Sequence, residues 1–144
     1  MYQPEEYLTI EVLSEVVSQL DWPAPYTLED ELPDGISMIF PKCTLFFGEG
    51  FESEMYLKFI PEDTGLDNAV TLKEVLVALG GRPTPQLKLV DDGSSGASVA
   101  TVKNGIRKLC TILLAHFRET LLGDFWWVEP YKAHRTAELK RAGR

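Results

Sequence analysis

The chain has 144 residues and a formal net charge of −8, and its apolar and charged fractions are those of a soluble globular protein. This length predicts one domain, residues 1–144, with an apolar core of its own. No apolar run approaches the roughly 20 residues of a transmembrane helix, and the acidic N-terminus lacks the basic region of a signal peptide. We therefore expect a cytoplasmic protein without a membrane partner.

Charge is divided unevenly along the chain. Residues 1–80 contain 16 Asp or Glu and 3 Lys, whereas residues 81–144 contain 6 acidic and 11 basic residues. The acidic part is expected to repel nucleic acid and to attract a basic protein by long-range steering. The alternative, that the acidity only keeps the protein soluble, stays open.

The first element in the chain is a predicted helix, from about residue 4 to about residue 20. Apolar residues recur there on one face, while glutamates occupy most of the other face and suit the positive end of the helix dipole. Pro23 and Pro25 end this helix, because proline cannot continue it. The acidic segment 29–34 that follows is predicted to be a loop.

Three short strands are predicted next, at residues 36–40, 44–47 and 54–60. In the third strand apolar and polar residues alternate, which is the pattern of a half-buried strand. The connectors are short, so we expect an antiparallel meander. Phe46 and Tyr56 fall on the face opposite the expected core. If no helix covers that face, it would present aromatic side chains beside acidic loops, as protein-binding surfaces do.

The second half of the chain predicts three helices. Thr71 and Glu74 have the spacing of a capping box, which opens a short helix. A fourth short strand is expected at residues 87–89, and Ser98 is the expected N-cap of a long helix that ends at Gly123. A final basic helix follows, at about residues 130–142. The predicted fold is therefore α+β: an N-terminal helix, an antiparallel meander of three to four strands, a short helix, then a long C-terminal helix and a final basic helix that cover the sheet.

The long helix carries the longest apolar stripe in the chain, and such a stripe must pack against another element. Trp126 and Trp127 follow this helix. We interpret the pair as a plug at the corner before the last helix, with a binding platform as the alternative. The stripe consists of Val99, Val102, Ile106, Leu109, Leu113, Phe117 and Leu121, widened by Cys110 and Leu114.

Motifs of catalytic or metal sites are not apparent in the sequence. Residues 63–74 resemble a calcium-binding loop only in part, since Gly65 replaces a ligand and Asn68 stands where the loop needs glycine. Cys43 and Cys110 are expected to be reduced thiols. We therefore expect no metal, no cofactor, no catalytic residue and no nucleic-acid partner. Because carboxylates are abundant, an enzyme with a carboxylate-based site remains a lesser alternative.

The segment from Leu113 to Trp126 resembles the closing helix of small bacterial immunity proteins, which are paired with polymorphic toxins. Size and acidity are also similar to that group. The resemblance implies a non-catalytic antitoxin that inhibits a cognate toxin. Size and acidity also fit the small acidic chaperones of type III secretion, which bind an effector as dimers. The basic helix after the tryptophan corner is not expected in those chaperones, and the oligomeric state of this chain stays open.

The predicted partner-binding site combines acidic loops with aromatic anchors. Its carboxylates would stand in for the phosphates of a nucleic-acid substrate, so the expected partner is a basic toxin domain such as a nuclease. The predicted site residues are Glu29, Asp30, Glu31, Asp34, Glu49, Phe51, Glu52, Glu54 and Tyr56.

Overall fold

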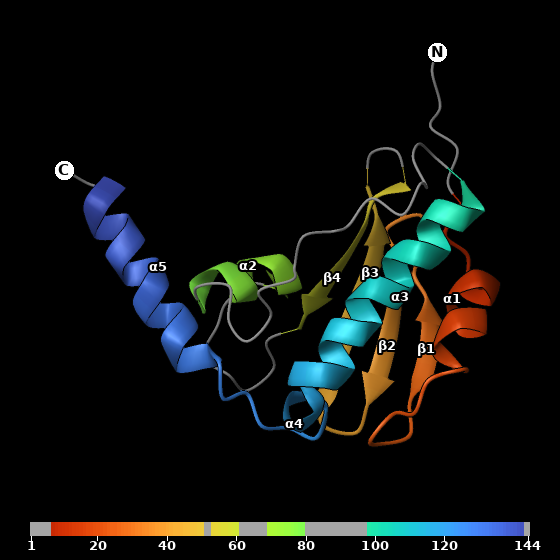
Figure 1. Ribbon diagram of the computed structural model, residues 1–144, viewed down its shortest axis with the longest axis horizontal. Helices are drawn as coiled ribbons and strands as arrows, with labels where there is room; N and C mark the ends of the chain where they lie inside the picture. Colours follow the sequence, from red (N-terminus) through yellow and green to blue (C-terminus); the bar gives the residue numbers. More distant parts are fainter. Residues whose placement is uncertain (1–6, 51–52, 61–68, 80–97, 143–144) are drawn as a thin grey trace, which may run out of the picture.

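The structure is a computed structural model, and it describes residues 7–50, 53–60, 69–79 and 98–142. The elements form the α+β arrangement predicted from the sequence (Figure 1). In chain order they are α1 (Ile10–Val17), β1 (Thr27–Asp30), β2 (Ile36–Phe40), β3 (Cys43–Glu49), β4 (Met55–Phe59), β5 (Val70–Thr71), α2 (Leu72–Ala78), α3 (Val99–His116), α4 (Arg118–Leu121) and α5 (Val128–Ala142).

The five strands form one antiparallel sheet in the order β1-β2-β3-β4-β5, so each strand pairs with its neighbour in the chain. The predicted meander is thereby confirmed. β2 has the predicted bounds, and the ends of β3 and β4 differ from the prediction by at most two residues. In register, Phe46 of β3 lies between Ser37 of β2 and Lys58 of β4.

Two strands were missing from the prediction. β1 lies in the segment predicted to be a loop. Among the described residues it pairs with β2 alone, and three of its four residues are exposed, so it lacks the alternating apolar residues from which a strand is predicted. β5 has two residues and is too short to produce a sequence pattern. The fourth strand predicted at residues 87–89 lies outside the described residues.

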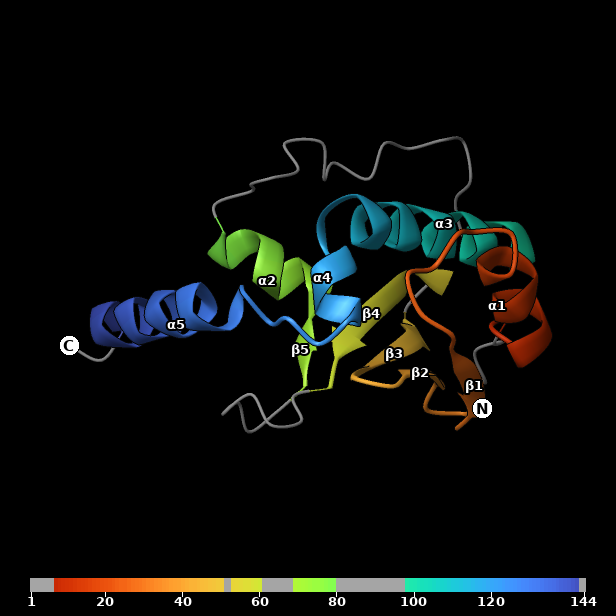
Figure 2. The same cartoon turned by 90° about the horizontal axis from the view of Figure 1, so that it is seen from below.

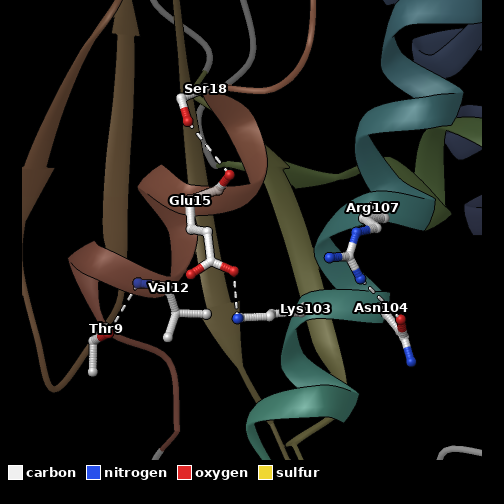
Figure 3. A network of polar contacts seen from close by, with 7 residues as sticks. All are labelled: Thr9, Val12, Glu15, Ser18, Lys103, Asn104 and Arg107. Atoms are coloured by element: carbon white, nitrogen blue, oxygen red, sulfur yellow. Dashed lines mark hydrogen bonds and ion pairs between the residues drawn. The ribbon is translucent and has the colours of Figure 1, made fainter.

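Helix α1 begins at Ile10 and not at the start of the chain. The Thr9 hydroxyl accepts a hydrogen bond from the Val12 N–H at 3.1 Å, so Thr9 is the N-cap and residues 7–9 precede the helix (Figure 3). At the other end, the indole of Trp22 donates to the Val17 carbonyl at 2.8 Å. Side chains thus form hydrogen bonds with free backbone groups at both ends of this short helix. The glutamates near the start of the chain did not indicate where the helix begins.

Helices α1 and α3 lie on the same face of the sheet and enclose the core against it (Figure 2). From α3, Val102, Ile106 and Leu113 are fully buried, as the stripe predicted, whereas Val99 in the first turn is 39 % exposed. Lys103 of α3 forms an ion pair with Glu15 of α1 across the outer side of the two helices (Figure 3). Among the described residues, the apolar strand residues of the core all share the face of the sheet that these helices cover.

The predicted long helix is divided in two. α3 stops at His116, because Phe117 leaves helical geometry with φ −128° and ψ 24°, and α4 adds one further turn. This break directs Phe117 into the core, where its ring centroid lies 5.7 Å from that of Phe59. Gly123, at φ +105°, then ends α4 in the left-handed region that glycine tolerates.

Helix α5 begins at Val128 and packs beside the sheet against α2, so the expectation that the last helix covers the sheet is corrected (Figure 1). Among the residues of this helix whose burial the structure describes, only Val128 and Tyr131 are buried. The physical reason is composition, because charged residues occupy all sides of the helix and leave no apolar stripe to lie on a sheet.

Candidate functional site

One face of the sheet has no helix over it in the described part of the chain (Figure 2). Side chains alternate across a strand, so the residues between the core positions share this face. We call it the open face. Its residues are Thr27, Glu29, Ser37, Ile39, Thr44, Phe46, Gly48, Tyr56 and Lys58.

Two aromatic rings of the open face, those of Phe46 and Tyr56, each lie against a glycine. A Cβ at Gly35 would lie 2.4 Å from Cζ of Phe46, and one at Gly48 would lie 2.2 Å from Cζ of Tyr56. Because a glycine has no side chain, each ring can lie directly against the backbone of its glycine. Lys58 Nζ stands 5.4 Å from the centroid of the Tyr56 ring, within the range of a cation–π interaction. The Tyr56 ring therefore already has a cation–π partner, Lys58, on its own strand.

The end of β1 and the turn that leads to β2 carry four exposed carboxylates, those of Glu29, Asp30, Glu31 and Asp34, and we call these four residues the acidic turn. Two of the side chains also shape the turn. Asp30 Oδ1 accepts from the Leu32 N–H at 2.9 Å, and Glu31 Oε2 accepts from the Ser37 hydroxyl. The local hydrogen bonds thus hold like charges close together on the surface.

Glu49 differs from Asp30 and Glu31, because both oxygens of its carboxylate accept hydrogen bonds within the protein. Oε1 accepts from the backbone N–H groups of Tyr7 and Leu8 at 2.9 and 2.7 Å, and Oε2 accepts from the Ser53 hydroxyl at 2.7 Å. Ser53 Oγ in turn accepts from the Ser98 N–H at 3.2 Å. This polar junction connects the N-terminal segment, the β3–β4 turn and the start of α3.

The structure brings most of the predicted site to one end of the sheet. Turns alternate between the two ends of a meander, so the β1–β2 turn and the β3–β4 turn lie at the same end. Glu54 is exposed in the second of these turns, and Tyr56 lies on the open face. Phe51 and Glu52 lie outside the described residues.

Sequence reasoning left Phe46 and Ile39 out of the predicted site, although both lie on the open face. The alternation of β3 had already placed Phe46 opposite the core. The signal that was available, and was not used, is the pair of glycines at 35 and 48. Glycine inside a strand, as Gly48 is in β3, often marks a close approach of another group, and Gly35 in the turn before β2 has such a neighbour as well.

The tryptophan corner separates into two roles. Trp127 is buried, its ring centroid lies 4.9 Å from that of Phe59, and its indole N–H donates to the Thr120 hydroxyl at 3.1 Å. Trp126 is 39 % exposed and stacks on Phe117 at 5.6 Å. The interpretation as a plug therefore fits Trp127, whereas Trp126 covers the core from the surface.

Reactive groups in the described residues are few. Cys43 and Cys110 are free and buried, and burial raises the pKa of each thiol to about 12, so the nucleophilic thiolate is scarce near neutral pH. Within residues 7–50, 53–60, 69–79 and 98–142, no three His, Cys, Asp or Glu side chains are grouped as metal ligands would be. The same residues form no helix long and apolar enough for a bilayer.

Comparisons with protein-family models, with curated proteins and with solved structures found no match.

Proposed function

We propose that this protein is a non-catalytic binding protein of the immunity type. It neutralises a cognate bacterial toxin, for example a nuclease, by covering a basic surface of the toxin with its acidic turn and its open face. One observation supports the proposal most strongly. Four exposed carboxylates and two aromatic rings, each packed against a glycine, lie at the same end of the sheet.

The two surfaces have complementary tasks. Four like charges held on one turn attract a basic surface before contact, and this attraction is screened over about 10 Å at 0.1 M salt. Aromatic rings contribute to the complex after contact, because they bury a large apolar area with little loss of conformational freedom. Phe46 and Tyr56 are the proposed anchors, and Lys58 is the cation that a partner's arginine or lysine would displace from the Tyr56 ring.

The test begins with the product of the adjacent reading frame, expressed as the candidate toxin. The protein is expected to protect cells from this toxin and to bind its purified domain, with an association rate that falls as salt rises. Changing Glu29, Asp30, Glu31 and Asp34 to their amides should slow association at least about tenfold, because these charges steer the encounter.

The matched control removes the same number of charges away from the acidic turn, on α4, on α5 and in the segment between them. It changes the exposed Glu119, Asp124, Glu129 and Glu138 to amides and should leave association within about threefold. The proposal is wrong if the adjacent product is not inhibited, or if the two quadruple variants slow association equally.

A further inference from the structure

β1 is an edge strand whose second side is not paired with any strand in the described part of the chain. Edge strands present unpaired N–H and C=O groups, which is why proteins commonly guard them with charge. The direction of the backbone groups in β1 decides which residues offer these hydrogen bonds to another chain.

The hydrogen bonds at the turn fix that direction. Glu31 N–H donates to the Gly35 carbonyl at 2.9 Å, and Gly35 N–H donates to the Glu31 carbonyl at 3.4 Å, so this is a hydrogen-bonded pair. In an antiparallel ladder such pairs alternate with pairs whose backbone groups point away. The register continues from Asp30 opposite Ile36, and therefore the N–H and C=O groups of Leu28 and Asp30 point to the free edge.

The side chains along this edge select the kind of strand that can use it. Glu29 of β1 and Glu31, one residue past its end, lie on the open-face side, since Glu29 is opposite Ser37 and Glu31 accepts from the Ser37 hydroxyl. They are two residues apart, which is about 7 Å along an extended chain. A second copy of β1 would bring the same carboxylates against them, and like charges opposite each other are destabilising. A strand with Lys or Arg at two alternate positions would place its charges beside both glutamates.

We infer that β1 accepts an extended segment of a basic protein as a sixth strand of the sheet. The segment carries Lys or Arg at positions i and i+2, beside Glu29 and Glu31, and its backbone bonds to Leu28 and Asp30. This inference rests on the proposed function, since it states how the basic partner would be held. The open face continues from the new strand, so one partner would contact the edge and the aromatic rings together.

The test compares two variants of Asp30. Asp30→Ala and Asp30→Pro both remove the carboxylate and its hydrogen bond to Leu32, but only the proline removes the outward N–H. The N–H of residue 30 takes no part in the β1–β2 ladder, so proline is expected to leave the fold intact, as circular dichroism will verify. The probe is a phage-displayed library of random dodecapeptides, selected on the full wild-type chain.

Selected peptides are expected to be enriched in Lys or Arg at alternate positions. They should bind Asp30→Pro at least tenfold more weakly than Asp30→Ala. Bound to the wild-type chain, they should slow amide hydrogen exchange at Leu28 and Asp30, a readout that holds even if the proline variant fails to fold. Equal binding to the two variants, unchanged exchange at both amides, or selection of no binder overturns the inference.

Failure of this inference is distinct from failure of the proposed function. If the toxin is inhibited equally by Asp30→Pro and Asp30→Ala, the sixth strand is wrong and the inhibitor function stands. If basic peptides pair with β1 while the adjacent gene product is not inhibited, the proposed function is wrong and the edge remains a binding site for basic strands.

Discussion

At the scale of single residues, Glu49 shows that position along the chain does not reveal what an acid does. Its carboxylate accepts three hydrogen bonds, two from the backbone and one from Ser53. Ser53 itself has φ +62°, an uncommon conformation for a residue with a side chain, and it is buried. The acids of the β1–β2 turn, in contrast, are exposed. Sequence alone grouped all of them as one surface.

Glu49→Gln should lower the free energy of unfolding by about 1–3 kcal/mol, because the amide NH₂ cannot accept the bonds that one carboxylate oxygen accepts and so leaves a donor unpaired. Urea denaturation measures this change. Glu54→Gln is the control, since Glu54 is exposed in the same turn and its change should stay within about 0.5 kcal/mol. Equal stability of the two variants would contradict the structural role of Glu49.

Residues of the open face were predictable where alternation was clear. Phe46 and Tyr56 could be assigned to it because both strands alternate apolar and polar side chains. The two glycines indicate a close approach of some side chain, but which ring lies against Gly35 and which against Gly48 could not be predicted, because a residue's neighbour across the sheet depends on register. The turn geometry that sets this register is a property of the folded chain.

At the scale of elements, the predictions succeeded where a local signal exists. The Thr71–Glu74 capping box is present with both of its hydrogen bonds, and Ser98 caps α3 by accepting from the Thr101 N–H at 3.0 Å. The predictions failed where a tertiary contact determines the local secondary structure. The division between α3 and α4 comes from the burial of Phe117, and β1 is a strand because β2 lies beside it.

Helix α5 is expected to contribute little to stability beyond its first turn. Deleting residues 133–144 should change the free energy of unfolding by less than about 1 kcal/mol, because the side chains of this part that the structure describes are exposed or only half-buried. Thermal unfolding followed by circular dichroism checks this expectation.

The comparison for α5 is a deletion of residues 127–144, which also removes the buried Trp127, Val128 and Tyr131. Loss of the tryptophan alone should cost about 3–5 kcal/mol, as large core truncations do. If the shorter deletion is as destabilising as the longer one, the exposed part of α5 has a structural role that its burial does not indicate.

At the scale of the whole molecule, charge follows the long axis. β1, with its acidic turn, and α5, with Lys132, Arg135, Lys140 and Arg141, lie at opposite ends (Figure 1). The uneven charge of the sequence predicted two regions of opposite sign. It did not predict how far apart they lie, because that distance depends on α5 packing beside the sheet against α2.

Stability is expected to fall in alkaline solution. Burial raises the pKa of the thiols of Cys43 and Cys110 from 9.0 to about 12, and it also raises the pKa of Tyr26 and Tyr131. The unfolded chain therefore releases these protons first. Stability that is present below pH 9 is lost as pH rises toward 12, by up to about 1.4 kcal/mol per pH unit for each thiol.

Urea unfolding between pH 8 and about 10.5 measures this loss. The double variant Cys43→Ala/Cys110→Ala has a lower starting stability, because it leaves small cavities, but its stability should decline less steeply with pH. An identical slope for the variant and the wild-type chain would show that the thiols do not set the alkaline limit.

The strict order of the strands has a consequence for synthesis. Because each strand pairs with its chain neighbour, the sheet can assemble on the ribosome hairpin by hairpin. The stripe of α3 that covers it begins at Val102, more than 40 residues after β4 ends. At about 5–20 residues per second, the part of the nascent sheet's apolar face that α3 later covers stays exposed for about 2–9 s. During that interval the exposed apolar surface of the growing polypeptide can bind other chains, and a holding chaperone would bind the polypeptide at that surface.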